Sequence, residues 1–373
     1  MKEKKITEEE MKYEYWFACV KRIRNKEKRK VREYIGSAKQ LYYMEETELK
    51  GILDKKEEAE ELIEARKSWN IEEEYEKLER NGIVFLPYFH PKYPKELDCL
   101  TTPPYALYLK GKFLSDQTLK VAIVGARGCS PYGERMAIEF GEELAAHGID
   151  IISGMARGVD GAGHRGALNV GGRSYAILGN GVDICYPKDH LGLYIDLQER
   201  GGILTEFPPG TMPLPQYFPA RNRIISALAD VVLVMEAKEK SGSLITADQA
   251  LELGKDVYAL PGPINSSLSE GCNRLIKQGA GILLSPRDLL EELHIFGEED
   301  VKKKLKNKIM LESRENMVYS CLGLYPKNIN QLVEETKMQI SELVNQLISL
   351  QVKGYVEEIS KNYYVRKAGF GGV

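Results

Sequence analysis

One stretch, residues 121–163, constrains the fold of this chain more than any other. It begins with the apolar run VAIV, which is typical of a fully buried parallel strand. Gly125 and Gly128 follow, and they allow a tight turn that leaves backbone N–H groups uncovered. A helical pattern over 131–147 and a second apolar run over 149–152 come next, and a second Gly-bearing loop follows them. The sequence therefore predicts two loops and two helix amino ends on one edge of a sheet, a geometry that binds anions such as phosphate.

The same alternation of short apolar runs and helical patterns continues to residue 295 and predicts an α/β fold. Such alternation favours an extended Rossmann-like, doubly wound, mostly parallel sheet that binds ligands beyond the carboxyl ends of its strands. The expected strands are 121–124, 149–152, 175–178, 203–206, 231–235, 257–260 and 281–284. The expected helices are 131–147, 159–169, 189–200, 220–229, 243–254 and 271–278.

Changes in composition predict further domains on both sides of this sheet. Residues 1–80 are charged and helical in pattern, which predicts a small all-helical domain. The sheet domain, 81–295, opens with a segment rich in proline and aromatic residues that we expect along the edge of the sheet. A charged linker, 296–310, leads to 311–373, where three helical patterns and a hairpin give the layout of a winged helix. Because these helices carry little basic charge, we favour a protein-contact or packing role for this domain over DNA reading.

Composition and charge narrow the class of protein. No apolar run approaches the length of about 18 residues that a membrane span needs, and the first residues lack the apolar core of a secretory signal. The six cysteines are scattered without a C-x-x-C pair, which fits reduced thiols in a bacterial-type cytoplasm and not a zinc site. With a net charge of −3, any polyanion must be bound by a local basic patch.

A basic run lies within the first 80 residues. We favour a solvated helix face for it, and an auxiliary nucleic-acid contact is the alternative. The run consists of Lys21, Arg22, Arg24, Lys26, Lys28, Arg29 and Lys30.

The first Gly-bearing loop matches neither common nucleotide signature. A dinucleotide fingerprint requires G-x-G-x-x-G and an acidic residue after the next strand, whereas GARGCSPYG has a different spacing and Ser153-Gly154 follows the strand. A P-loop requires a G-K-[ST] ending, which is absent. We therefore expect no cofactor. What remains is an anion site that already carries a cation, Arg127, which can fork onto a phosphate or pair with a local carboxylate.

Further anion-binding groups are expected along the same edge. Arg221-Asn222-Arg223 is placed at a helix start beside Tyr186, Tyr217 and Phe218, which suits phosphates and bases. In the alternative, these aromatic rings are packed and the arginines brace neighbouring loops. Arg173 lies at the other end of the sheet or in the preceding turn. The complete set of predicted phosphate- or DNA-binding residues is Gly125, Arg127, Ser130, Gly154, Arg157, Gly158, Arg173, Gly179, Gly181, Arg221, Asn222, Arg223, Ser241, Gly242, Ser243 and Thr246.

Residues suited to catalysis are scarce. No pair of carboxylates, no Ser/His/Asp set and no metal-ligand cluster emerges, so the sequence favours binding without catalysis and without a metal. Glu206 and Glu236 end strands and can serve as acids, but we favour a cap or an arginine partner for each. Asp160 is expected to cap the following helix or to orient Arg157, with the cap favoured. We expect a structural hydrogen bond for His164.

Taken together, the motifs resemble the DNA-processing protein A family, also called DprA or Smf. The segments VGARGCSPYG, SGMARGVDGAGHRGAL, FPARNRII and SGSLITA stand in this order within a resemblance that covers roughly residues 85–290. The outer parts resemble a sterile-alpha-motif or helix-hairpin-helix module and a DML1-like winged helix. The first of these lacks the glycine-rich hairpin typical of a helix-hairpin-helix.

The resemblance implies a function as well as a fold. It implies a cytoplasmic protein that binds single-stranded DNA, protects incoming strands and loads the RecA recombinase onto them in natural transformation and recombination. It also implies a homodimer formed through residues 271–285, where Leu275, Ile276 and Ile282 are either exposed contacts or core residues. One alternative is a Rossmann-like enzyme that hydrolyses nucleoside phosphates with Glu206 near the phosphate. Another is a partner-binding scaffold that binds no nucleic acid.

Overall fold

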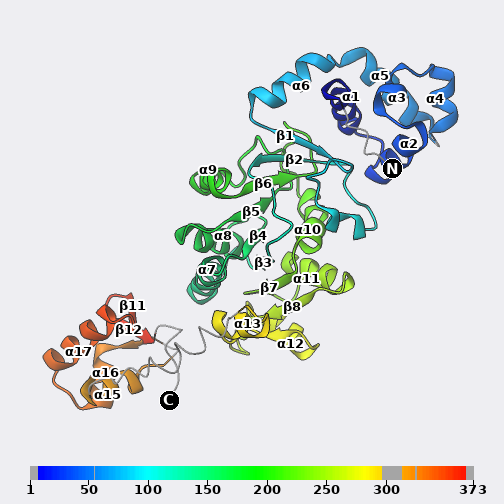
Figure 1. Cartoon of the computed structure of the whole chain (residues 1–373). Helices are drawn as coiled ribbons and strands as arrows, with labels where there is room; N and C mark the ends of the chain where they lie inside the picture. The colour runs from blue at the N-terminus through cyan, green and yellow to red at the C-terminus, as the bar shows by residue number, and fades with distance from the viewer. Residues whose placement is uncertain (1–6, 54, 296–312, 324–325, 367–373) are drawn as a thin grey trace. The chain divides into compact units, whose positions relative to one another are not determined.

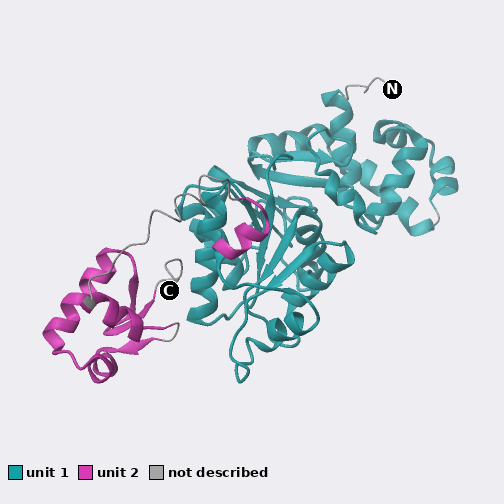
Figure 2. Cartoon of the chain, turned by 60° about the horizontal axis from the view of Figure 1, so that its bottom comes forward, with its two compact units in different colours: residues 1–286 teal, residues 287–373 magenta. Residues whose placement is uncertain are grey.

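The computed structural model describes residues 7–53, 55–295, 313–323 and 326–366. The chain divides into two compact units, 1–286 and 287–373, which are coloured separately in Figure 2. The expected linker, 296–310, lies outside the described residues.

Short helices form the amino-terminal part of the first unit, as the charged, helical pattern predicts. The first of them begins with a capping box between Thr7 and Glu10 and buries Trp16 and Phe17 completely. In the described residues these helices are α1 Glu8–Cys19, α2 Asn25–Ile35, α3 Ala38–Tyr43, α4 Glu46–Ile52, α5 Lys56–Ser68 and α6 Ile71–Arg80.

A mostly parallel sheet forms the rest of the first unit, with the strand order β1-β2-β6-β5-β4-β3-β7-β8-β9 (Figure 1). The segment rich in proline contributes β1 and β2, which join the edge at β6 as antiparallel strands. Every strand expected from the apolar runs is present; the one expected over 231–235 is one residue shorter, and the last is two residues shorter. The strands are β1 Val84–Pro87, β2 Ala106–Gly111, β3 Lys120–Val124, β4 Asp150–Ser153, β5 Ser174–Ile177, β6 Gly202–Thr205, β7 Val231–Val234, β8 Asp256–Ala259 and β9 Gly281–Ile282.

Helices cover both faces of this sheet, with α7, α8 and α9 on one side and α10 and α11 on the other (Figure 1). Most helix boundaries differ from the expected ones by one or two residues, and one start differs by three. Helix α10 begins at Tyr217, not at residue 220, because Pro219 is tolerated in the first turn, where its missing N–H is not needed. The helices are α7 Pro131–Ala146, α8 Val159–Asn169, α9 Leu191–Arg200, α10 Tyr217–Leu228, α11 Gly242–Glu252, α12 Glu270–Lys277 and α13 Pro286–Glu292, with short 3-10 helices at Lys95–Cys99 and Lys188–His190.

The sheet has its topological switch point between β3 and β7. From β3 the chain proceeds outward through β4, β5 and β6, and it then crosses back to β7 on the other side of β3. The loops that follow β3 and β7 therefore diverge from one crevice at the carboxyl ends of the strands. In open α/β sheets this crevice is where ligands bind.

The second unit contains helices and a small antiparallel sheet, as expected for a winged helix. Its described core includes Leu332, Leu343, Leu347 and Leu350, and Asn362 adopts a positive φ of 66° at the tip of the hairpin. The elements are α15 Ser313–Cys321, β10 Lys327–Asn328, α16 Ile329–Thr336, α17 Ile340–Val352, β11 Val356–Ser360 and β12 Tyr363–Arg366.

Candidate nucleic-acid interface

Arg127 is exposed at the carboxyl end of β3 and lies over an aromatic ring. Its guanidinium carbon is 5.3 Å from the centroid of the Phe218 ring. That ring stacks in turn on Tyr186, with centroids 5.6 Å apart and planes 25° apart, and Tyr186 is 42% exposed. No ion pair holds Arg127 among the described residues, so the expected alternative of a carboxylate partner is not seen. The arrangement offers a positive charge beside an exposed ring at the switch-point edge.

Glycines hold this stack in place because the loops pack directly on one another. A Cβ on Gly158, whose φ is 74°, would lie 2.6 Å from the carbonyl oxygen of Arg127. A Cβ on Gly179 would lie 2.9 Å from the Phe218 ring. Both positions therefore require glycine. The absence of a side chain at these positions leaves room for Arg127 and Phe218.

Arg157, in the second loop, is exposed and paired. Its guanidinium donates to Asp189, with the Nε at 3.1 Å, and the two side chains are 63% and 67% exposed. An ion pair this exposed contributes about 0–1 kcal/mol, so a phosphate can compete for Arg157. The expectation that Asp160 orients Arg157 is wrong, since Asp189 does so.

A carboxylate of the protein itself binds the amino end of α7. The backbone N–H of Ser130 donates to Glu236 Oε2 at 2.8 Å, and the Ser130 hydroxyl donates to Oε1 at 2.6 Å. Ser130 also caps the helix, because its Oγ accepts from the N–H of Gly133 at 3.2 Å. Ser130, and not Glu236, is thus the cap of α7, whereas a cap or an arginine partner was the expected role of Glu236; Ser130 is occupied by its bonds to Glu236.

Arg221 lies beneath the second loop and not on the surface. It is 4% exposed, and its Nη1 donates to the carbonyl oxygens of Gly154, at 2.8 Å, and Ile177. Burial lowers the pKa of Arg221 to about 10, although the nearby Asp160 opposes this shift. The prediction that Arg221 touches DNA directly is wrong for this structure, because neighbouring atoms surround its guanidinium.

Asp160 completes this buried arrangement. Its Oδ2 accepts from the N–H of Gly154 at 3.2 Å, and the side chain is 7% exposed. Burial raises the pKa of Asp160, and the charge of Arg221 counteracts the shift. The favoured reading of Asp160 as the cap of α8 is wrong, because Gly158 holds that position and no side chain caps it.

Arg223 forms a buried ion pair within the fold. Its Nη2 donates to Glu206 Oε2 at 2.6 Å, and the two side chains are 16% and 7% exposed. Asn25, on α2, donates to the same oxygen at 2.9 Å. Burial raises the pKa of Glu206, while Arg223 lowers it. As expected, the partner of Glu206 is an arginine. The bond from Asn25 to Glu206 connects α2 to the sheet domain.

Two more predicted contacts lie away from the interface. Arg173 immediately precedes β5, at the amino end of the strands, and its Nε donates to the buried Asp150 at 2.7 Å. Thr246 is 1% exposed inside α11. Both predictions are therefore wrong: Arg173 lies at the opposite edge of the sheet, and Thr246 is buried.

The remaining predicted residues stay at the carboxyl edge. Asn222 Nδ2 donates to the carbonyl of Gly242 at 3.2 Å, and the hydroxyls of Ser241 and Ser243 lie 2.8 Å apart. The N–H of Gly181 is taken by the carbonyl of Thr211 at 2.9 Å. Gly242 is exposed and Ser241 is half-buried, so these two can contact a ligand.

His164 is structural, as expected. Its side chain is fully buried, and Nδ1 lies 2.6 Å from the Ser174 hydroxyl. Burial lowers the pKa of His164 to about 3, which keeps the ring neutral near pH 7.

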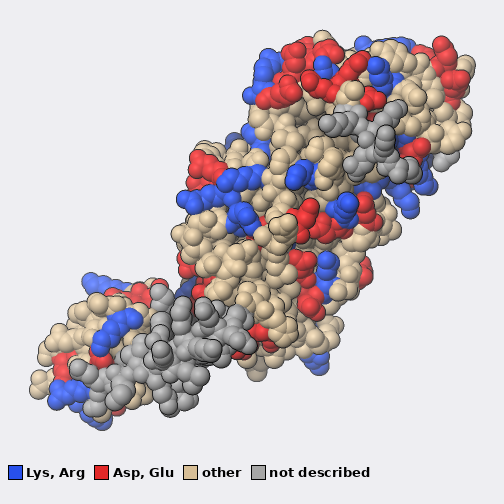
Figure 3. All heavy atoms as spheres, in the orientation of Figure 1, with Lys and Arg blue, Asp and Glu red and all other residues tan. Residues whose placement is uncertain are grey.

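Two residues of the basic run, Lys28 and Arg29, are used inside the protein, whereas the other five are exposed, as expected for a solvated face. Lys28 is 4% exposed and donates to the carbonyl of Ala18. Arg29 bonds Asp98, Tyr93 and the carbonyl of Pro104. On the face seen in Figure 3, Lys and Arg side chains are mixed with Asp and Glu.

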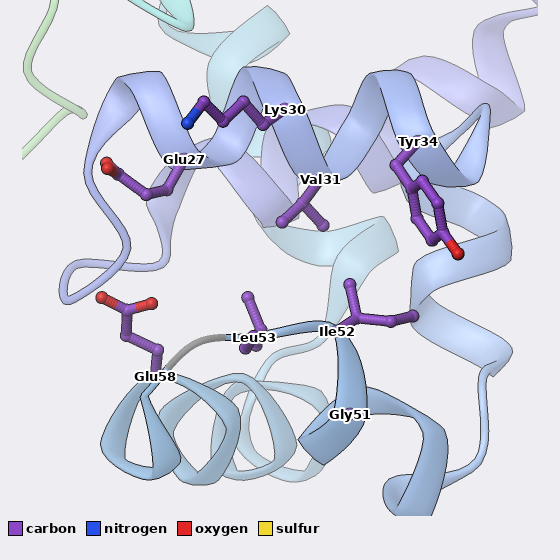
Figure 4. A pocket seen from close by; sticks show the side chains of 8 residues that line it. All are labelled: Glu27, Lys30, Val31, Tyr34, Gly51, Ile52, Leu53 and Glu58. Atoms are coloured by element: carbon purple, nitrogen blue, oxygen red, sulfur yellow. The ribbon is translucent and has the colours of Figure 1, made fainter.

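A separate pocket of about 350 Å³ opens between α2 and the segment that joins α4 to α5. Glu27 and Glu58 face each other at one end of it, with Lys30 nearby (Figure 4). Each carboxylate has an ion-pair partner, Arg24 for Glu27 and Lys55 for Glu58, and the pocket lies among the amino-terminal helices, so we keep it apart from the interface. It is lined by Glu27, Lys30, Val31, Tyr34, Gly51, Ile52, Leu53 and Glu58.

The residues expected at a dimer contact differ in exposure. Leu275 is 4% exposed and packs in the core, so it is not an exposed contact. Ile276 is partly buried against the same core. Ile282 is 45% exposed on the edge strand β9, close in sequence to Leu284, which is 72% exposed.

The described residues contain neither a candidate membrane span nor a candidate metal centre. No helix there is long and apolar enough to cross a membrane. No group of His, Cys, Asp and Glu side chains in that part of the chain is arranged to hold a metal ion.

Known proteins are similar to this chain over most of its length. The Smf protein of Escherichia coli K12 is 39% identical over 293 residues, which cover 77% of this chain and 78% of that protein. The DNA processing protein DprA of Streptococcus pneumoniae R6 is 42% identical over 200 residues, 54% of this chain and 71% of that protein.

Solved structures agree with this assignment. The X-ray structure of DprA from Streptococcus pneumoniae matches with a TM-score of 0.67 and 34% identity, over 78% of this chain and 99% of that one. DprA from Helicobacter pylori, solved to describe its single-stranded DNA binding mode, matches with a TM-score of 0.52 and 34% identity, over 57% and 95%. The family model described as DNA recombination-mediator protein A matches residues 84–294. The expected resemblance is confirmed: the chain belongs to the DNA recombination-mediator protein A family.

Proposed function

We propose that this protein binds single-stranded DNA along the carboxyl edge of its sheet, protects it and delivers it to the RecA recombinase during recombination. The observation that carries the proposal is the stack of Arg127, Phe218 and Tyr186. A cation beside an exposed ring accepts a phosphate and a base together, and such stacking tolerates any base. Family membership and the DNA-binding relative from Helicobacter pylori support it.

The ligand follows from the chemistry of the edge. Arg127 carries its charge into solvent, Arg157 can exchange Asp189 for a phosphate, and Ser241 and Gly242 offer polar groups on a neighbouring loop. Phosphate contacts spread over several loops suit a polymer of phosphates, and flexible single strands expose the bases that stack on aromatic rings.

The test is a fluorescence anisotropy titration of labelled oligothymidine and of a mixed-sequence single strand over a range of salt. Arg127→Ala should weaken binding about five- to tenfold on both strands and reduce the salt slope by about 0.7. Arg200→Ala is the matched control, since it removes one exposed arginine at the carboxyl end of α9. Equal affinity of the Arg127 variant and the control would remove Arg127 from the interface.

Delivery to the recombinase needs its own measurement. Purified protein should accelerate the formation of RecA filaments on single strands already covered by a single-strand-binding protein, and the Arg127 variant should do so less well. If DNA binds normally but filament formation stays unchanged, the DNA-binding proposal stands and the loading proposal falls.

We also propose binding without catalysis, in a reducing cytoplasm. The strand-end carboxylates that hydrolysis would need are engaged, Glu206 with Arg223 and Glu236 with Ser130. All six cysteines are free, in keeping with a reducing compartment. Release of free base from nucleoside monophosphates by the pure protein would overturn the non-catalytic part.

A homodimer through the β9 edge is the expected assembly. Unpaired edge strands with exposed apolar side chains favour association, and Ile282 and Leu284 supply such side chains. The double variant Ile282→Asp and Leu284→Asp should elute as a monomer in light scattering at concentrations where the wild-type protein is dimeric. A change of the exposed Ile195 to Asp, on α9, controls for added charge.

A further inference from the structure

We propose that Glu236 is an internal anion that fills the phosphate position of the first Gly-bearing loop and makes it inaccessible to phosphate. A DNA backbone is then confined to the outer side of that loop, at Arg127. This second part rests on the proposed function, whereas the first stands on the geometry alone.

The position of Glu236 is the place where this fold binds ligands. Strands β3 and β7 are neighbours, with Val124 opposite Val234, and the N–H of Met235 donates to the carbonyl of Val124 at 3.0 Å. Glu236 therefore enters the switch-point crevice from the β7 side. On the β3 side of the same crevice is the amino end of α7, where the helix dipole and free N–H groups attract anions.

The carboxylate binds there as a phosphate would. One oxygen accepts from the backbone N–H of Ser130 and the other from its hydroxyl, at 2.8 and 2.6 Å. Backbone N–H and hydroxyl donors at a helix amino end are the groups that hold phosphate oxygens. Glu236 is 4% exposed, so its charge is enclosed and compensated by this helix end.

The first turn of α7 is shaped to admit this side chain. A Cβ on Gly133 would lie 2.5 Å from both the carboxyl carbon and Oε2 of Glu236. Glycine at this position therefore leaves room for the carboxylate, in a helix where glycine otherwise lowers stability.

The backbone around Glu236 is held from the other side. The N–H of Ala237 donates to the carbonyl of Leu268 at 2.8 Å, and its carbonyl accepts from the N–H of Gly271 at 2.8 Å. Both neighbours of Glu236 are therefore bonded, which fixes the backbone of Glu236 at the mouth of the crevice.

The consequence is selectivity between a polymer and a mononucleotide. A terminal phosphate inserted into the crevice would meet a buried carboxylate at hydrogen-bond distance from the same donors, and like charges repel strongly where water is excluded. A DNA strand passing over Arg127 and Phe218 avoids the crevice. Glu236 thus excludes small phosphate ligands from a fold that commonly binds them.

The experiment compares wild-type protein with Glu236→Ala and Glu236→Gln, using inorganic phosphate as the probe. Glu236→Ala empties the crevice, so this variant should bind phosphate saturably in calorimetry, about tenfold more tightly than the wild type does. Phosphate should also raise the melting temperature of the variant. Sodium chloride at matched ionic strength should have no such effect. The Gln side chain keeps the crevice filled, so Glu236→Gln should gain less phosphate affinity than Glu236→Ala.

Two outcomes would overturn the inference. One is equal phosphate affinity of the wild type and Glu236→Ala, and the other is saturable phosphate binding by the wild type that is abolished by Ser130→Ala. If Glu236→Ala does not fold, the same comparison is made with Glu236→Ser, which also empties the crevice, and unchanged phosphate affinity of that variant again overturns the inference. Oligothymidine titrations on the same samples test the proposed function separately. If the wild-type protein does not bind DNA, the proposed function is wrong, but the result with phosphate still decides the role of Glu236.

Discussion

Single residues at this sheet edge divide into those that face solvent and those that hold the loops. Arg127 and Tyr186 face solvent, whereas Arg221, Asp160 and Glu236 are almost completely buried. Buried charges are retained only when other groups compensate them, and here each has a hydrogen-bond partner within the loops. The solvent-facing residues therefore determine binding, and the buried ones determine the shape of the loops.

Burial of His164 should make the unfolding free energy of the protein fall in acid. Its pKa is lowered by burial to about 3, below its unfolded value of 6.5, so the ring is neutral in the folded protein and charged in the acid-unfolded chain. Its contribution to stability is present above pH 6.5 and is lost as pH falls toward 3. The loss should approach about 1.4 kcal/mol per pH unit.

Urea unfolding between pH 7 and pH 5 checks this. His164→Asn should be less stable than the wild type near neutral pH but lose less stability on acidification, whereas His147→Asn, nearer the surface, should follow the wild-type curve. A parallel pH dependence of the His164 variant and the wild type would show that His164 does not cause the loss.

Helix α7 has a glycine, Gly133, in its first turn, although glycine is unfavourable in helices. Gly133 lies in its first turn against the Glu236 carboxylate. By contrast, a Cβ at Gly192, in the first turn of α9, would meet nothing within 4 Å. Both glycines lower the helix propensity by the same amount. They differ in their surroundings, because Gly133 packs against a carboxylate and Gly192 faces open space.

Alanine at these two positions should therefore have opposite effects. Gly133→Ala should destabilise the protein by about 2–3 kcal/mol, because it displaces a carboxylate with charge-assisted hydrogen bonds. Gly192→Ala should stabilise it by about 0.5–1 kcal/mol. Urea unfolding measures both, and a stabilising Gly133→Ala would show that α7 accommodates the methyl group without moving Glu236.

For the molecule as a whole, the first unit joins the amino-terminal helices to the sheet through a shared aromatic core and, beside it, a polar seam. Arg29, which is 13% exposed, reaches from α2 to Asp98 and to the carbonyl of Pro104. It also lies over the ring of Tyr88, 4.5 Å from the centroid. Asn25 adds its bond to Glu206. A planar guanidinium can make all of the Arg29 contacts at once, and an ammonium cannot.

Arg29→Lys should consequently weaken the seam although charge is conserved. We expect a loss of about 1–3 kcal/mol in unfolding free energy and faster proteolysis within the amino-terminal helices. Arg24→Lys, at a side chain that is 73% exposed, should leave both unchanged. Equal proteolysis of the two variants would show that Arg29 does not hold the seam.

The sequence by itself determined the elements of this protein and the family to which it belongs. Strands such as 121–124 and the helix from Pro131 were predicted to within about two residues, because apolar runs, glycines and caps act locally. Only the tertiary structure decided which charges meet. Ser130 and Glu236 are 106 residues apart, and Asn25 and Glu206 are 181 apart, so no local pattern encodes either contact. The loop expected to hold a phosphate instead holds the chain's own carboxylate, because packing β7 beside β3 brings Glu236 to the amino end of α7.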